Sequence, residues 1–127
     1  MREGADVSIF ATGHLVFPAL EAAEMLQAQG INAEVVNFAT IKPLDIDAVL
    51  NSARKTRCVV TAEEHFLNGG LGDAVCQCLS RNFPVPVETI GVDDRFGQSG
   101  TPDELMKFFG LDKEHIVEAC QKAINRK

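Results

Sequence analysis

The chain has 127 residues, of which 46% are hydrophobic and 24% are charged, a balance typical of one globular domain spanning residues 1–127. Its 18 acidic and 12 basic residues give a net charge of −6 without any block of Lys or Arg, which argues against nucleic acid and membranes as partners. No apolar stretch reaches the roughly 20 residues that cross a bilayer, and no signal-peptide pattern opens the sequence, so we expect a cytoplasmic protein.

The first apolar run, residues 7–12, predicts a short buried β-strand that ends at Gly13. Residues 14–30 are rich in strong helix formers and predict a helix. Pro18 suits the first turn of that helix, where its missing N–H does no harm. Gly30 is expected to end the helix in a left-handed conformation.

Residues 33–38 predict the second strand, and a helix is expected to begin near Asp45. The carboxylate of Asp45 can accept a hydrogen bond from a free backbone N–H of the first turn. Apolar residues then recur at helical spacing, at Ile46, Val49, Leu50 and Ala53.

Residues 58–63 predict the third strand, and residues 85–92 predict the fourth. The helix between them should bury one apolar face, formed by Leu71, Val75, Cys78 and Leu79. After the fourth strand, "TPDEL" has the pattern of a helix capping box. A last helix is expected to open near Asp112 and to run toward Asn125.

Strands and helices thus alternate along the chain, which predicts a parallel sheet with helices on both faces. Right-handed crossovers give the strand order 2-1-3-4 as the simplest arrangement. In this order the direction of winding changes between the first and third strands. We therefore expect the segments 12–14 and 63–70 to face one crevice, with His14 and His65 at its mouth.

Two adjacent carboxylates and an imidazole, at Glu63, Glu64 and His65, follow the third apolar run. A carboxylate beside a histidine can tune general acid or base catalysis, because histidine titrates near neutral pH. Adjacent residues of an extended segment point to opposite sides, however, so both carboxylates cannot face one substrate. No G-x-S-x-G nucleophile motif is present. We therefore assign no catalytic residue and favour a loop shaped for a domain or subunit contact.

The stretch "NGGLG" at residues 68–72 permits two interpretations. Gly69 and Gly70 precede a helix, and the N–H groups at a helix N-terminus can bind a phosphate. The pattern is neither G-x-G-x-x-G nor a Walker A motif, and the nearby carboxylates of Glu63 and Glu64 would repel a phosphate. We favour a conformational role, in which glycines provide positive φ angles or a close backbone approach.

Apolar residues in two polar segments indicate a docking surface. Phe96 lies beside Asp94 and Arg95 in "DDRFGQSG", and Phe66 lies beside Leu67 in the glycine-rich segment. Aromatic side chains in such settings commonly anchor protein contacts.

The four cysteines form no C-x-x-C pair, and each lies in an apolar strand or helix pattern: Cys58, Cys76, Cys78 and Cys120. We expect buried thiols that act as small hydrophobic residues, and no metal ligands.

Three blocks together resemble one known family: "DVSIFATGHLVFPALEAAEMLQAQGINAEVVNFATIKPLD", "VVTAEEHFLNGGLGDAV" and "VETIGVDDRFGQSGTPDELMKFFGL". In this order and spacing they look like the C-terminal domain of transketolases, and most closely the separately encoded C-terminal section of split transketolases. Deoxyxylulose-phosphate synthases and the beta subunits of 2-oxoacid dehydrogenases share this domain and are the near alternatives. The sequence "DRFGQSGTPDEL" followed by "GL" favours transketolase.

The resemblance implies a three-layer α/β/α domain with a mainly parallel sheet of four to five strands. The additional strand is antiparallel at a sheet edge and would be reduced here to a vestige before "REG". The family transfers a two-carbon ketol unit between sugar phosphates, as in the pentose phosphate pathway, with thiamine diphosphate and magnesium. Other domains hold that cofactor through a G-D-G motif and an activating glutamate, neither of which is found in this sequence. The chain alone is therefore expected to bind no cofactor and to be inactive.

The resemblance also implies the partners of the chain. These are the pyrimidine-binding and diphosphate-binding domains, or the N-terminal section, of the same enzyme within a homodimer. The segment after the third strand would offer His65, Phe66 and Asn68 to a neighbouring domain. An alternative of a different class is a freestanding flavodoxin-like small-molecule-binding module that uses the crevice between segments 12–14 and 63–70.

Overall fold

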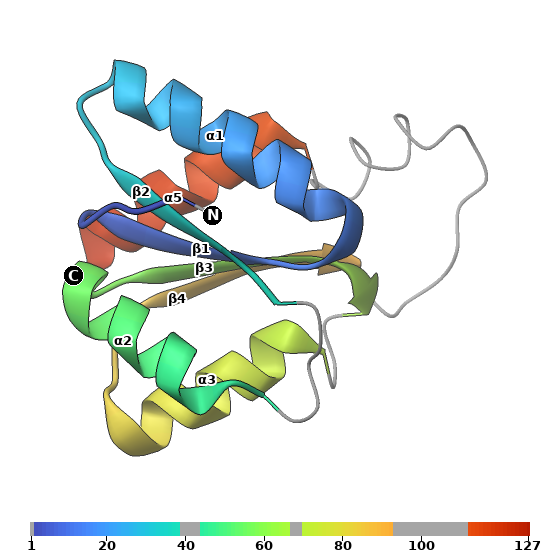
Figure 1. Cartoon of the computed structure of the whole chain (residues 1–127), viewed down its shortest axis with the longest axis vertical. Coiled ribbons are helices and arrows are strands. Elements are labelled where there is room, and N and C mark those ends of the chain that lie inside the picture. The colour runs from blue at the N-terminus through green and yellow to red at the C-terminus, as the bar shows by residue number, and fades with distance from the viewer. Residues whose placement is uncertain (1, 39–43, 67–69, 93–111) are drawn as a thin grey trace.

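The structure, a computed structural model, describes residues 2–38, 44–66, 70–92 and 112–127. Figure 1 shows three layers, with a central sheet that has helices on both of its faces. The four strands are all parallel and lie in the order β2-β1-β3-β4. They are β1 (Val7–Ala11), β2 (Ala33–Asn37), β3 (Val59–Phe66) and β4 (Val87–Val92). Both the α/β class and the strand order predicted from right-handed crossovers are confirmed.

The helices cover the two faces of the sheet in pairs. Helices α1 (Val16–Ala28) and α5 (Lys113–Arg126) pack on one face. Helices α2 (Ile46–Thr56) and α3 (Leu71–Asn82) pack on the other. Every residue of β1 is buried, because side chains of a strand alternate between the faces and here both faces are covered.

The helix ends follow the local rules read from the sequence. A 3₁₀ turn, η1 (Gly13–Leu15), precedes α1, and Pro18 lies in the first turn of α1. Gly30 follows the helix with φ 81°. Asp45 accepts a hydrogen bond from Ala48 N–H at 3.1 Å at the start of α2. The predicted start of this helix and the left-handed glycine are therefore confirmed.

Strand boundaries differ from the prediction where the backbone pairing is irregular. β3 continues to Phe66, with a shift of register against β4 between Ala62 and Phe66. β4 begins at Val87 and not at residue 85. Two prolines precede this strand, at residues 84 and 86, and a proline cannot donate a hydrogen bond to the sheet.

A short antiparallel bridge extends the sheet beyond β2. Arg2 pairs with Val35, and their backbone groups exchange hydrogen bonds of 3.3 Å and 2.9 Å. The bridge is antiparallel and lies at the sheet edge, where the resemblance implied a further strand. Within the described ranges, no helix is both long enough and apolar enough to cross a membrane.

Candidate functional site

The carboxyl ends of β1 and β3 lie side by side in the middle of the sheet. Thr12 N–H donates a hydrogen bond of 3.1 Å to the carbonyl oxygen of Ala62. Gly13, with φ 56°, then turns the chain into η1. The segments 12–14 and 63–70 therefore begin next to each other, at the position where ligands and partners of parallel α/β sheets usually bind.

The buried side chain of Glu63 caps the N-terminus of α3. Its Oε2 accepts a hydrogen bond from Leu71 N–H at 2.6 Å, and its Oε1 accepts one from Gly72 N–H at 3.1 Å. The residue is 0% exposed. Free N–H groups and the helix dipole both favour a negative charge at this position. The expectation that Glu63 faces the crevice is therefore corrected, since its carboxylate is used within the domain.

The same arrangement decides between the two interpretations of the glycine-rich stretch for the residues described. Gly70 has φ −94° and carries no left-handed turn. Gly72 supports a close approach, because an added Cβ would lie 3.0 Å from Thr89 Cγ2 and 3.2 Å from Thr61 Oγ1. The N-terminus of α3 is already occupied by the carboxylate of Glu63, which leaves no place there for a phosphate.

One buried hydroxyl group lies beside this helix start, at Thr61, and a second follows β1, at Thr12. Thr61 Oγ1 and Thr12 Oγ1 have no hydrogen-bond partner among the described residues. Thr61 is 0% exposed and Thr12 is 6% exposed. Thr61 precedes Glu63 by two positions in β3, so both side chains lie on the same face of the sheet.

The remaining predicted residues are placed only in part. The backbone of Glu64, His65 and Phe66 continues β3, and the backbone of His14 forms the centre of η1. The other residues predicted for the interdomain surface lie outside the described residues: Asn68, Gly69, Asp94, Arg95 and Phe96.

Two exposed hydrophobic residues at this end of the sheet were missed by the sequence patterns. Phe17, in the first turn of α1, is 68% exposed, and Ile46, the first residue of α2, is 51% exposed. Ile46 was grouped with Val49 and Leu50 by helical spacing, yet only the latter two are buried. Both helices begin at the carboxyl end of the sheet, where the strands before them end (Figure 1). A residue at the very start of a helix, such as Ile46, can extend past the sheet that covers the rest of its face.

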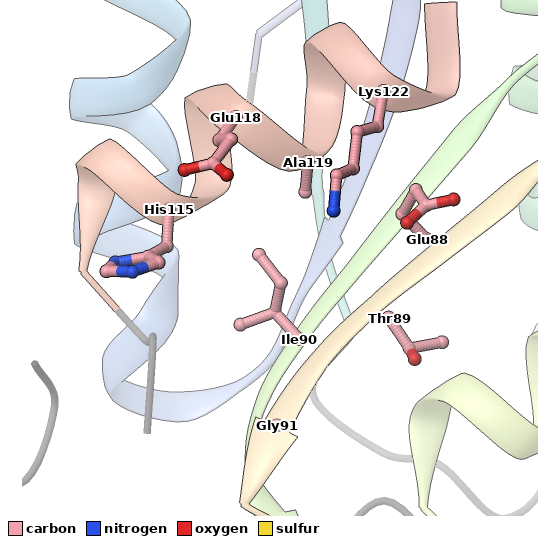
Figure 2. A pocket seen from close by; sticks show the side chains of 8 residues that line it. All are labelled: Glu88, Thr89, Ile90, Gly91, His115, Glu118, Ala119 and Lys122. Atoms are coloured by element: carbon pink, nitrogen blue, oxygen red, sulfur yellow. The ribbon is translucent and has the colours of Figure 1, made fainter. Parts of the chain in front are cut away.

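A hollow of about 250 Å³ lies between β4 and α5. Figure 2 shows Ile90 at its centre and His115, Glu118 and Lys122 along α5. The side chain of His115 is 50% exposed and forms an ion pair with Asp112. The hydrogen bond with this carboxylate raises the pKa of His115 above its ordinary value of 6.5. The hollow thus combines both signs of charge and carries no single preference for an anion or a cation.

The cysteines are free thiols, and three of the four are buried. Burial raises the pKa of Cys58, Cys78 and Cys120, which disfavours the reactive thiolate form. Cys76 is exposed and corrects the expectation that all four are buried, because it lies on the outer side of α3. Across the described part of the chain, no three His, Cys, Asp or Glu residues are grouped to hold a metal ion.

Comparison with known proteins identifies the family. Residues 1–116 match the family described as "Transketolase, C-terminal domain". The chain is 52% identical over 127 residues to the 6-deoxy-6-sulfo-D-fructose transketolase subunit SqwH of Clostridium sp. (strain MSTE9), covering 100% of this chain and 39% of that protein. It is 42% identical over 123 residues to 1-deoxy-D-xylulose-5-phosphate synthase 1 of Geobacter sulfurreducens, covering 95% of this chain and 19% of that protein.

A solved structure agrees with these relatives. The chain superposes with a TM-score of 0.95 and 50% identity on a split-gene transketolase described as an inactive beta4 tetramer, covering 99% of this chain and 41% of that one. The chain thus spans about two-fifths of the length of its transketolase relatives. The matched residues, the identity and the shared fold lead to one conclusion: the chain belongs to the family of transketolase C-terminal domains.

Proposed function

We propose that the chain serves as the assembly domain of a transketolase, packing against the domains that transfer a two-carbon ketol unit between sugar phosphates. The observation that carries this proposal is the position of its exposed hydrophobic residues. Phe17 and Ile46, the two most exposed among the described large hydrophobic residues, both lie at the carboxyl end of the sheet. Exposing such side chains to water costs free energy, so their position at the same end of the sheet favours a protein contact there.

The predicted contact segment begins at the same end. The backbone of β3 extends to Phe66, directly beyond the point where Thr12 binds Ala62. We define the docking face as Phe17, Ile46 and the segments 12–14 and 64–70. Its predicted occupant is the pyrimidine-binding domain, or the N-terminal section, of the same enzyme in a homodimer.

Thiamine diphosphate and magnesium belong, in this proposal, to the other domains of the enzyme. The residues of this chain do not fit the diphosphate at the start of α3, because Glu63 already fills it with negative charge. The described residues also contain no group of metal-binding side chains. The solved split-gene relative is described as inactive when made of beta chains alone, which supports the expectation that this chain does not act by itself.

A freestanding small-molecule binder remains the alternative from another class. It would use the crevice beside segments 12–14 and 63–70, where Glu63 opposes phosphate-containing ligands. Titration of the chain with nucleotides, flavin and sugar phosphates separates the two proposals. Saturable binding at micromolar concentration would favour the binder, and we expect none.

The docking face is tested by reconstitution. The chain is mixed with the cofactor-binding section of the enzyme, thiamine diphosphate and magnesium, and both association and ketol transfer are measured. We expect the double substitution Phe17→Ser and Ile46→Ser to weaken association at least about tenfold, because loss of a buried anchor at an interface commonly costs more than 1.4 kcal/mol.

The matched control is Met25→Ser, which also replaces an exposed hydrophobic residue of α1, 36% exposed, but toward the other end of the helix. Met25→Ser should associate like the unmodified chain. Unchanged association and turnover of the folded double variant would contradict the proposal. Alanine at His65, Phe66 and Asn68 tests the predicted contact segment in the same assay.

A further inference from the structure

The carboxylate of Glu63 is held by the helix that begins eight residues later in the chain. Its hydrogen bonds to Leu71 N–H and Gly72 N–H connect the carboxyl end of β3 to the first turn of α3. Gly70, at the N-cap position of α3, has no side chain that could accept these bonds. Glu63 therefore supplies the cap that the local sequence does not provide.

The surroundings of this carboxylate leave few substitutes for it. Both N–H donors and the side chain are buried, so water cannot readily replace the carboxylate if it is removed. Thr61 Oγ1 lies beside Gly72, at 3.2 Å from the position of an added Cβ, and it is itself buried without a described partner. A buried N–H left without an acceptor is costly, and more so beside further unpaired polar atoms.

We propose that Glu63 is a positioning residue whose carboxylate is a built-in anion, fixing the start of α3 to the sheet. The two hydrogen bonds of Glu63 to α3 are sufficient for this role. Because residues 64–70 connect Glu63 to Leu71, one side chain holds both ends of that segment. Where the docking face of the proposed function is correct, Glu63 also sets the position of the contact segment toward the partner.

Removal and chemical replacement of the anion test the first part. In Glu63→Ala we expect the thermal midpoint of the chain to fall by about 10 °C, from the loss of two charge-assisted hydrogen bonds. Formate, which carries the missing carboxylate, should restore about half of that loss at high concentration through binding to the folded state. Sodium chloride at equal ionic strength should not.

Two further variants serve as controls for this test. Asp45→Ala removes an exposed helix cap at α2, where water replaces the lost acceptor, so formate and chloride should act alike on it. Glu63→Gln keeps the size of the side chain but provides one acceptor in place of two, and it carries the test if Glu63→Ala does not fold. Equal stability of Glu63→Gln and the unmodified chain, or no difference between formate and chloride in Glu63→Ala, would overturn the proposal.

Association with the cofactor-binding section tests the second part and separates it from the proposed function. We expect Glu63→Gln to weaken association about tenfold at a temperature where the variant is fully folded, and formate to restore association of Glu63→Ala. Weaker association of the Phe17 and Ile46 double variant without any effect of Glu63 variants would refute the positioning role alone. No effect of either set would refute the docking face itself.

Discussion

Polar side chains cap the starts of several helices in this fold. Some of these caps lie close to their helix in the sequence, and one lies in the preceding strand. Asp45 and Asp112 each accept an N–H three residues ahead, and such local caps can be recognised from the sequence. Glu63 caps α3 from the preceding strand, eight residues before Leu71. No local pattern identifies that partner, because it depends on where β3 ends relative to α3.

Gly4 offers a residue-scale prediction at the sheet edge. A Cβ at this position would lie 2.5 Å from the carbonyl carbon of Ala33 and 2.7 Å from that of Asn32. These are backbone atoms that cannot rotate away. We expect Gly4→Ala to lower the free energy of unfolding by about 1–3 kcal/mol, as overpacking usually does, measured by urea denaturation.

The control for Gly4 is Glu3→Ala, which changes the exposed neighbouring residue without adding an atom next to β2. It should alter stability by less than about 0.5 kcal/mol. If Gly4→Ala were as stable as the unmodified chain, the close approach of the N-terminal segment to β2 would be wrong.

At the scale of whole elements, helix periodicity predicted which face is buried more reliably than it predicted the ends. The buried faces of α3 and α5 follow helical spacing, and Leu71, Val75 and Leu79 are buried as expected. The first turns behave differently, because Phe17 in the first turn of α1 and Ile46 in that of α2 are exposed. The burial of a first turn depends on how far the facing strand extends, which periodicity does not describe.

The start of α5 carries a pH-dependent contact that can be measured directly. The hydrogen bond and charge of Asp112, with smaller contributions from Glu118 and Glu114, raise the pKa of His115 above 6.5. Because the folded-state pKa is raised, the stabilisation is complete below pH 6.5 and is lost as pH rises through the folded-state value. We expect NMR titration of the imidazole to give a pKa above that of an unfolded peptide.

Substitution of the partner tests the cause of this shift. Asp112→Asn keeps an acceptor for the N-cap but removes the charge, so the pKa of His115 should fall toward its ordinary value. Glu118→Gln should produce a smaller decrease. A pKa of His115 that is unaffected by Asp112→Asn would show that another group causes the shift.

The whole molecule is organised around one sheet that contributes to two hydrophobic clusters. Val7 and Ile9 of β1 pack toward α1 and α5, whereas Phe10 packs toward α2 and α3. Phe10 also contacts Phe38 edge to face, with ring centroids 5.1 Å apart. Both central strands, β1 and β3, contribute side chains to both hydrophobic clusters. We therefore propose that residues 1–127 unfold as one unit.

Hydrogen exchange tests this cooperativity. Leu26 of α1 and Leu79 of α3 lie on opposite faces and are 0% and 1% exposed. Leu26→Ala and Leu79→Ala should each cost about 2–5 kcal/mol and should lower the protection of the slowest amides in α1, α2, α3 and α5 by the same factor. Loss of protection confined to the helices on the substituted face would contradict a single unit.

The sequence by itself determined the class of the fold, the strand order and the family. Strand and helix periods are local properties of neighbouring residues, and right-handed crossovers leave few arrangements for four alternating units. The match of residues 1–116 to transketolase C-terminal domains confirms the resemblance that its three blocks carried. The antiparallel Arg2–Val35 bridge lies at the sheet edge where the resemblance implied a further strand.

Only the tertiary structure decided what the residues at the carboxyl ends of β1 and β3 do. From the sequence, Glu63 could be a catalytic group or a contact residue, and its hydrogen bonds to Leu71 and Gly72 make it a buried cap instead. The exposure of Phe17 and Ile46 likewise appears only once the helices are placed on the sheet. The physical reason is common to both: burial and hydrogen bonding between segments depend on the relative position of elements, which local sequence patterns do not encode.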